Sequence, residues 1–232
     1  MKSNQEIETE LLRRPTSLGN DVYEALYAQL MSLKIPPGGR ISVDGLVRSL
    51  GVSQTPIREA LSRLEAQGLV VKTHLIGYSA AEQLDRDRLN QLYELRLLLE
   101  PFAAGRLARR RDAQAISELR ALDQEMRRED KAQSRAAYGE FAKRDAEFHN
   151  FIARPCGNEL VHESLQRLHT HVHLFRLYFH ARATTDANRE HAEIVSAIED
   201  GDSVRAEEAM RIHIERSKAR FEDAFEDSGA MK

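Results

Sequence analysis

The chain has little of what marks a secreted or membrane protein. Its single cysteine, Cys156, excludes an internal disulfide framework and is more typical of a small buried side chain than of a nucleophile. No apolar run approaches the roughly 18 residues that a membrane-spanning helix needs. The first 20 residues are too polar for a secretory signal peptide. We therefore expect a protein of the cytoplasm with no membrane partner.

An excess of positive charge is also missing, since the formal net charge is −3. Residues 1–80 contain nine Lys and Arg against eight Asp and Glu, a sum of +1, so residues 81–232 carry −4. Any binding of DNA must depend on where individual charges lie rather than on an overall basic field. The 232 residues, 41% hydrophobic and 31% charged, are sufficient for two folded domains.

Three helices are predicted in the first part of the chain. Apolar residues recur at helical spacing over 20–33, and the Pro-Pro-Gly-Gly run at 36–39 ends that helix. A short helix over 43–50 is followed by Gly51, which suits the left-handed C-cap position. A third helix over 53–68 opens on a serine N-cap and a proline in its first turn.

A β-hairpin is predicted after the third helix. Residues 69–71 favour β-structure, a turn contains Gly77, and a second strand reaches Ala80. Three helices followed by a hairpin is the order of a winged helix-turn-helix. We therefore expect a DNA-binding domain over 18–80, preceded by a flexible tail over 1–17.

The third helix has one face for packing and one for DNA. Its polar residues near the N-terminal end are Gln54, Thr55 and Arg58. Glutamine can pair with adenine, arginine with guanine or a phosphate, and threonine with a thymine methyl or a phosphate. A packed three-helix unit with a solvated polar face is the alternative interpretation. The apolar residues expected to pack together are Ile57, Leu61 and Leu64 of this helix and Leu46, Val47 and Leu50 of the helix before it.

The segment from Leu46 to Leu69, which follows Pro37-Gly38, closely resembles the signature of the GntR family of regulators. The resemblance implies that Thr55 and Arg58 contact double-stranded DNA and that the wing reaches the minor groove. Many family members have arginine where this chain has Gln54. The resemblance also implies DNA contacts by His74 and Gly77 in the wing. Arg48 is a weaker candidate, for a contact with a phosphate.

From residue 83 onward the pattern is helical, which predicts an antiparallel all-helical bundle as the second domain, over 81–225. A C-terminal tail is expected over 226–232. The protein as a whole is thus predicted to be mainly α. The expected helices lie at 85–110, 113–128, 133–154, 158–181, 187–200 and 202–224.

Four residues of the second domain form a candidate metal site. Asp145 and His149 are four residues apart, which puts them on one face of a helix. His191 and His213 lie on two later helices that a tight turn joins, and an antiparallel pairing brings them to one level. Three nitrogens and one oxygen suit a divalent ion such as Zn²⁺ or Ni²⁺. An Asp-x-x-x-His pair alone is frequent by chance.

A denser histidine cluster is a rival to this set. On a single helix, His169 and His173 share a face while His171 points elsewhere. We expect members of this cluster to line a pocket rather than to be the primary ligands.

The helical part also resembles the FCD effector domain of the FadR subfamily, through segments that include Tyr93–Pro101, Asp145–His149 and the region from His191 to His213. The resemblance implies that the four residues above bind the metal and that the domain senses a small organic acid. It also implies that Arg96 contacts the effector carboxylate in a bidentate manner. The alternative role of Arg96 is a surface salt bridge with Glu100, four residues on.

The function predicted from these observations is a ligand-responsive repressor that binds a pseudo-palindromic operator as a homodimer. One alternative is a metal-dependent hydrolase on a helical bundle, although the sequence offers no convincing nucleophile or base beside the metal set. Another is a DNA-binding protein whose helical domain only dimerises. On the leading hypothesis the protein is not an enzyme.

Overall fold

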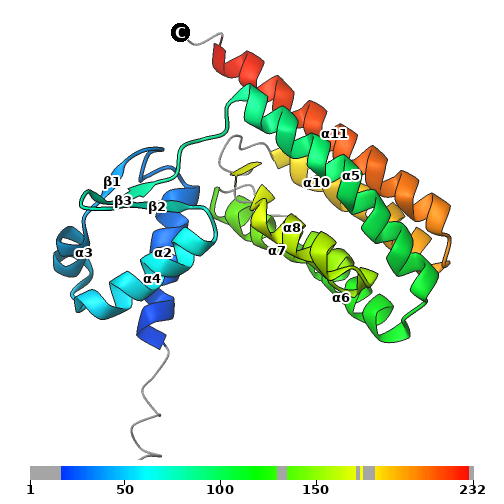
Figure 1. The fold of residues 1–232 in the computed structure, drawn as a ribbon, viewed down its shortest axis with the longest axis horizontal. Helices are drawn as coiled ribbons and strands as arrows, with labels where there is room; N and C mark the ends of the chain where they lie inside the picture. Colours follow the sequence, from blue (N-terminus) through cyan, green and yellow to red (C-terminus); the bar gives the residue numbers. More distant parts are fainter. Residues whose placement is uncertain (1–16, 130–134, 171–172, 175–180, 230–232) are drawn as a thin grey trace, which may run out of the picture. The chain divides into compact units, whose positions relative to one another are not determined.

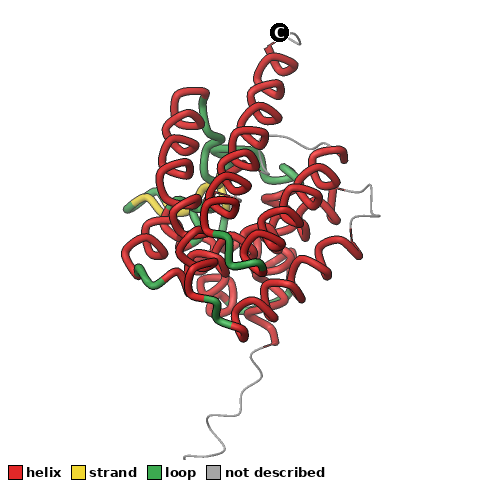
Figure 2. The backbone as a smooth tube through the Cα atoms, turned by 90° about the vertical axis from the view of Figure 1, so that its right-hand side faces the viewer, coloured by secondary structure: helices red, strands yellow, loops and turns green. Residues whose placement is uncertain are grey.

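The computed structural model describes residues 17–129, 135–170, 173–174 and 181–229. The chain divides into two compact units, Met1–Leu30 with Lys34–Ala81 and Met31–Leu33 with Glu82–Lys232. Helices predominate, and the short strands of the described residues all lie in the first unit (Figure 2). The predicted mainly α fold is therefore confirmed. No helix in the described ranges is long and apolar enough to cross a membrane.

Three helices of the first unit carry the predicted helix-turn-helix: α2 (Ser17–Met31), α3 (Val43–Leu50) and α4 (Gln54–Ala66) (Figure 1). Helix α2 ends before the predicted residue 33, where Leu33 has a φ of 57°. Ser42 caps α3 by accepting a hydrogen bond from the Gly45 amide, and Gly51 ends α3 in the left-handed conformation. Ser53 occupies the N-cap of α4, but its side chain makes no capping hydrogen bond.

The wing is an antiparallel sheet with the order β1-β3-β2. Strands β2 (Val70–Thr73) and β3 (Gly77–Ala80) form the predicted hairpin, in which Thr73 pairs with Gly77. Gly77 begins the second strand instead of lying inside the turn. Strand β1 (Arg40–Ile41) was not predicted, because two residues are too few to show a periodic pattern.

The core of the first unit contains apolar side chains of both α4 and α2. Ile57, Leu61 and Leu64 of α4 are fully buried, as are Leu26 and Leu30 of α2. The expectation that α3 packs inward is only partly met. Its apolar residues Leu46, Val47 and Leu50 are half-buried, and α3 has no buried residue.

The second unit is a helical bundle. Helix α11 packs along both α5 and α10, and α6 and α7 pack on each other and on these helices (Figure 1). Cys156 is fully buried and free, as predicted. The elements are α5 (Arg86–Arg110), α6 (Ala113–Glu129), α7 (Arg135–Ala153), the 3₁₀ turn η1 (Arg154–Cys156), α8 (Glu159–Arg167), α10 (Ala181–Glu199) and α11 (Ser203–Gly229).

The prediction of one helix over 158–181 is wrong. Helix α8 ends at Arg167, and His169 has a φ of 46°, which interrupts the helix. His169 and His173 therefore do not share a face of one continuous helix, and His171 lies outside the described residues.

Two other helices are longer than predicted. Helix α10 begins at Ala181 rather than 187, and α11 continues to Gly229, beyond the expected start of the C-terminal tail. Residues 1–16 and 230–232 of the two expected tails lie outside the described residues.

Candidate metal centre and nucleic-acid interface

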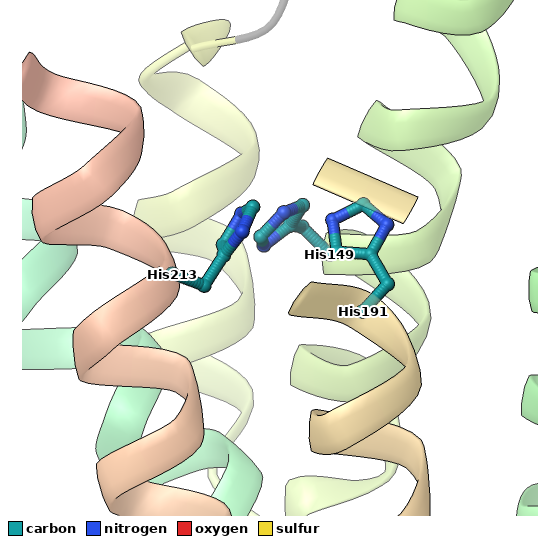
Figure 3. A group of neighbouring side chains, drawn as sticks. All are labelled: His149, His191 and His213. Carbon is teal, nitrogen blue, oxygen red and sulfur yellow. The ribbon is translucent and has the colours of Figure 1, made fainter. Parts of the chain in front are cut away.

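Three imidazoles from three helices converge inside the second unit. His149 of α7, His191 of α10 and His213 of α11 are all buried, and they point toward one another (Figure 3). Each offers a ring nitrogen that lies within 4.8 Å of those of the other two. Tetrahedral zinc, with Zn–N bonds of about 2.0–2.1 Å, holds its nitrogens about 3.3 Å apart. The three rings therefore need only a small adjustment to bind one ion.

Asp145 lies beside this triad, one turn before His149 on α7. Its Oδ1 atom is 3.3 Å from Nε2 of His191 and 4.0 Å from Nε2 of His149. The ring of Phe148 stacks on His191, with centroids 4.1 Å apart. The structure thus brings together all four residues of the predicted site. Their chemistry, three imidazoles and a carboxylate, fits a divalent first-row ion.

A buried carboxylate, that of Glu100, forms a hydrogen bond with the ring of His149. Its Nδ1 lies 2.5 Å from Oε2 of Glu100, and Glu100 accepts a 2.6 Å hydrogen bond from Nε of Arg96. Burial alone would raise the pKa of Glu100, but Arg96 and His149 outweigh it and hold that pKa well below its usual range. An ionised Glu100 that accepts from Nδ1–H leaves Nε2 of His149 for a metal.

His213 has the same kind of support on the other side of the site. Its Nδ1 lies 2.9 Å from Oε2 of Glu190, which also accepts hydrogen bonds of 2.9 and 3.0 Å from Arg220. Burial lowers the pKa of His213 despite the hydrogen bond to Glu190. The ring is therefore held neutral, the form in which an imidazole binds a metal.

Arg96 forms a salt bridge with Glu100, which was the predicted alternative to a contact with the effector. The bridge to Glu100 is not on the surface, however, because Arg96 is 1% exposed. Glu100 accepts two of the five N–H groups of the guanidinium. A contact between Arg96 and a carboxylate effector stays a prediction.

The residues predicted to contact DNA are all exposed. Arg58 donates a 3.2 Å hydrogen bond to Gln54, which in turn donates a 3.0 Å hydrogen bond to Asp44 of α3. Such exposed hydrogen bonds are easily exchanged for contacts with bases or phosphates. Arg48 lies on α3, Gln54, Thr55 and Arg58 lie in the first two turns of α4, and His74 and Gly77 lie in the wing.

Several residues with a place in these sites escaped the sequence analysis. Leu75 and Ile76, 94% and 67% exposed, form the tip of the wing between two predicted contact residues. Glu190 was not considered, and Glu100 was considered only as a partner of Arg96. Their carboxylates contact His213 and His149 from other helices. Glu190 directly precedes the predicted ligand His191, and an acidic residue at that position could have drawn attention to it. Only the fold shows that Glu190 contacts His213.

Known protein families match both the winged unit and the helical unit of the chain. Residues 18–77 match the gntR family of bacterial regulatory proteins, and residues 91–216 match the FCD domain. An HTH-type transcriptional regulator from an unstable DNA locus of Streptomyces ambofaciens is 30% identical, over 88% of this chain and 83% of its own. A probable D-xylose utilization operon transcriptional repressor of Paenarthrobacter nicotinovorans is 28% identical, over 86% of each chain.

The fold is shared with a solved regulator. The structure of Escherichia coli McbR/YncC superposes with a TM-score of 0.68 and 18% identity, over 91% of this chain and all of that one. The family match excludes the metal-dependent hydrolase considered above, because these relatives are regulators and not enzymes. The chain belongs to the GntR family and is a transcriptional regulator with a DNA-binding domain followed by an FCD domain.

Proposed function

We propose that the protein is a metal-containing, ligand-responsive repressor that binds a pseudo-palindromic operator as a homodimer. The observation that carries the proposal is the buried histidine triad in the FCD domain of a chain that begins with a winged helix-turn-helix. Zn²⁺ or Ni²⁺ is the proposed ion, bound by Asp145, His149, His191 and His213. The proposed place of action is the cytoplasm, where a bacterial regulator meets its DNA.

The effector is proposed to be a small carboxylate that binds beside the ion. Four protein ligands leave coordination positions open on an ion that accepts five or six, and a carboxylate oxygen is a suitable ligand for them. The ion supplies positive charge for the effector, and Arg96 is a buried cation that donates to Glu100, the carboxylate that contacts His149. Effector binding then changes DNA affinity by favouring one of two arrangements of the protein.

DNA contacts are proposed for both parts of the winged domain. Arg58, Gln54 and Thr55 of α4 would read the major groove, and Arg48 of α3 would contact a phosphate. His74 and Gly77 would approach the minor groove from the wing. The near-neutral net charge of the first 80 residues is compatible with this role, because the polar groups are gathered at one end of α4.

An apolar stripe on α5 supports the homodimer. Leu95, Leu98 and Phe102 follow one another at spacings of three and four residues and are 42%, 70% and 40% exposed. Residues at this spacing share one face of a helix. A second copy of the chain can cover this stripe by presenting the same face, as in a twofold-symmetric interface.

The test is a gel shift on the DNA upstream of the gene, with protein loaded with Zn²⁺ and a panel of small carboxylates. We expect a specific shift whose affinity at least one carboxylate changes, in either direction, by fivefold or more, in line with typical coupling energies. Elemental analysis on the same sample should give about one metal per chain. A shift that no carboxylate changes would favour a helical domain that only dimerises. Metal binding without any DNA shift would contradict the proposal that the operator lies upstream of the gene.

A further inference from the structure

The tip of the wing carries two large apolar side chains that face solvent. Leu75 is 94% exposed and Ile76 is 67% exposed, and all other residues of the segment 71–77 are exposed as well. The hairpin therefore projects beyond the core of the first unit, which its buried residues Val70 and Tyr78 join. Single exposed apolar residues are ordinary, but two adjacent ones at the end of a projecting hairpin indicate a surface that contacts another molecule.

The backbone of the tip is strained at its most exposed residue. The Ile76 amide donates a 3.2 Å hydrogen bond to the Thr73 carbonyl, which closes a four-residue turn with Leu75 in its third position. Leu75 has a φ of 63°, a left-handed conformation that glycine adopts without steric cost and leucine does not. Turns with a positive φ at this position favour glycine or asparagine. Residues held in such conformations cluster at functional sites, which favours a function for the exposed leucine.

DNA is the partner that the surroundings of the tip favour. The match to the gntR family runs to residue 77, so the tip lies inside the DNA-binding domain. The hairpin from Val70 to Ala80 contains no acidic residue, and the exposed Lys72 supplies a positive charge on the strand that leads to the tip. A surface of this composition is compatible with the phosphates that flank a groove of DNA. An apolar groove in another protein would not require such a charge.

We infer that Leu75 enters the step between two base pairs from the minor groove and kinks the operator, with Ile76 extending the apolar contact. This inference rests on the proposed function, in which the wing approaches the minor groove. The base edges in that groove offer polar groups that a leucine side chain cannot pair with, whereas the faces of two unstacked bases are apolar. Leucine and isoleucine are among the side chains that minor-groove proteins insert in this way, bending DNA by about 20–90°.

A wedge gives the wing a way to select DNA without hydrogen bonds to the bases. Pyrimidine–purine steps such as TA and CA unstack easily, whereas A-tracts are stiff. The operator should therefore contain a pyrimidine–purine step under the wing tip. Affinity should depend on that step because opening it has a cost, although neither apolar side chain forms a hydrogen bond with it.

The test begins with short duplexes that the full-length protein selects from a random-sequence pool, so that it does not depend on where the operator lies. A fluorescent donor and acceptor at the two ends of a selected duplex measure the bend by energy transfer. 2-Aminopurine in place of adenines under the wing reports unstacking by a rise in fluorescence. We expect the parent protein to bend the duplex by about 20° or more and to produce this rise.

The double variant Leu75→Ala with Ile76→Ala should lose both the bend and the rise in fluorescence. Alanine keeps the backbone amides of the tip, so only the apolar atoms of the wedge are removed. Leu160→Ala, at a 73% exposed leucine of α8, is the matched control and should keep both signals.

A change in the DNA measures the selectivity of the wing. Replacing the pyrimidine–purine step by AA should weaken binding of the parent protein by about fivefold or more, the usual cost of one mismatched base pair. The same replacement should weaken binding of the double variant by about twofold or less, because its wing does not open the step.

A glycine at the tip separates the wedge from a structural role. Leu75→Gly relieves the left-handed strain and removes the wedge, so this variant should unfold at the same temperature as the parent protein or higher, while the bend decreases. A purely structural role for Leu75 predicts the reverse, a less stable protein that bends the duplex as before. Thermal unfolding followed by circular dichroism supplies the stability readout.

The inference is overturned if the parent protein binds the duplex without bending it, or if the double variant bends it to the same angle. An apolar tip that only lies in the groove, or that contacts another protein, gives the first of these results. The proposed function fails separately, if the pool yields no duplex that the protein binds, and this result contradicts the wedge as well. Binding and bending are measured on the same duplex, so the two failures are distinguishable.

Discussion

Single side chains behind the histidines should control how tightly the metal is held. Glu190→Gln removes the negative charge that orients His213 and leaves Arg220 without its partner. We expect the affinity for Zn²⁺ to fall about 10- to 100-fold, the usual cost of losing such a supporting carboxylate. Competition with a chelator of known affinity measures the change. Glu193→Gln, on the same helix but 69% exposed at its side chain, should have no effect; equal affinities for all three proteins would refute this role of Glu190.

Arg58 should be decisive for operator binding. A well-placed arginine–guanine contact contributes about 1–3 kcal/mol, so Arg58→Ala should lower the affinity for the operator by about tenfold or more. Fluorescence anisotropy with the upstream DNA measures the loss, and circular dichroism should show the helical content unchanged because Arg58 is exposed. Glu65→Ala, another exposed residue of α4, is the control. An affinity that survives Arg58→Ala would place the DNA contact elsewhere.

Residue types, spacing and the resemblance to the FCD domain were sufficient to predict four residues that the structure brings together, but not the carboxylates that contact them. Asp145 and His149 share a helix face by spacing alone, and the predicted antiparallel pairing of two later helices put His191 and His213 at one level. The resemblance to the FCD domain then implied that all four bind one metal. Glu100 lies 49 positions from His149 and Glu190 lies 23 from His213. Such pairs follow from how the helices pack, which no local pattern specifies.

A single helix face should decide the oligomeric state. Leu98→Glu puts a charge in the middle of the apolar stripe on α5, at a side chain that is 70% exposed, so the fold itself should tolerate it. We expect light scattering to show a dimer for the parent protein and a monomer for the variant, and operator affinity to fall in the variant, because a dimer contacts two half-sites. Val204→Glu, at a 74% exposed position on α11, is the matched control. A dimeric Leu98→Glu protein would move the interface away from α5.

Element boundaries were predictable where a residue type dictates them. Gly51 ends α3 in the left-handed conformation that glycine adopts at no steric cost. The break after α8 was not predictable in this way, because His169 takes a φ of 46° that its residue type does not favour. Strand β1 depends entirely on its partner β3, so its two residues carry no pattern of their own.

For the molecule as a whole, the metal should be a major source of stability. An ion that binds only the folded protein adds about 4 kcal/mol at a free concentration one thousand times its Kd. Removing it with a chelator should therefore lower the unfolding temperature by several degrees, and Zn²⁺ should restore it. His149→Ala should abolish this response, whereas His162→Ala, at a half-buried position on α8, should keep it. Calorimetry with and without Zn²⁺ measures the difference; an unfolding temperature that is indifferent to chelation would mean that the triad binds no metal.

The order of the elements along the chain has a consequence for the synthesis of the protein. The winged unit is complete at Ala81, whereas the last histidine of the triad lies on α11, the final helix. As the chain leaves the ribosome, domains generally fold in order from the N-terminus. Each newly made molecule can thus fold its DNA-binding unit before all three histidines are available, and the proposed ion can be bound by the whole triad only after α11 has left the ribosome.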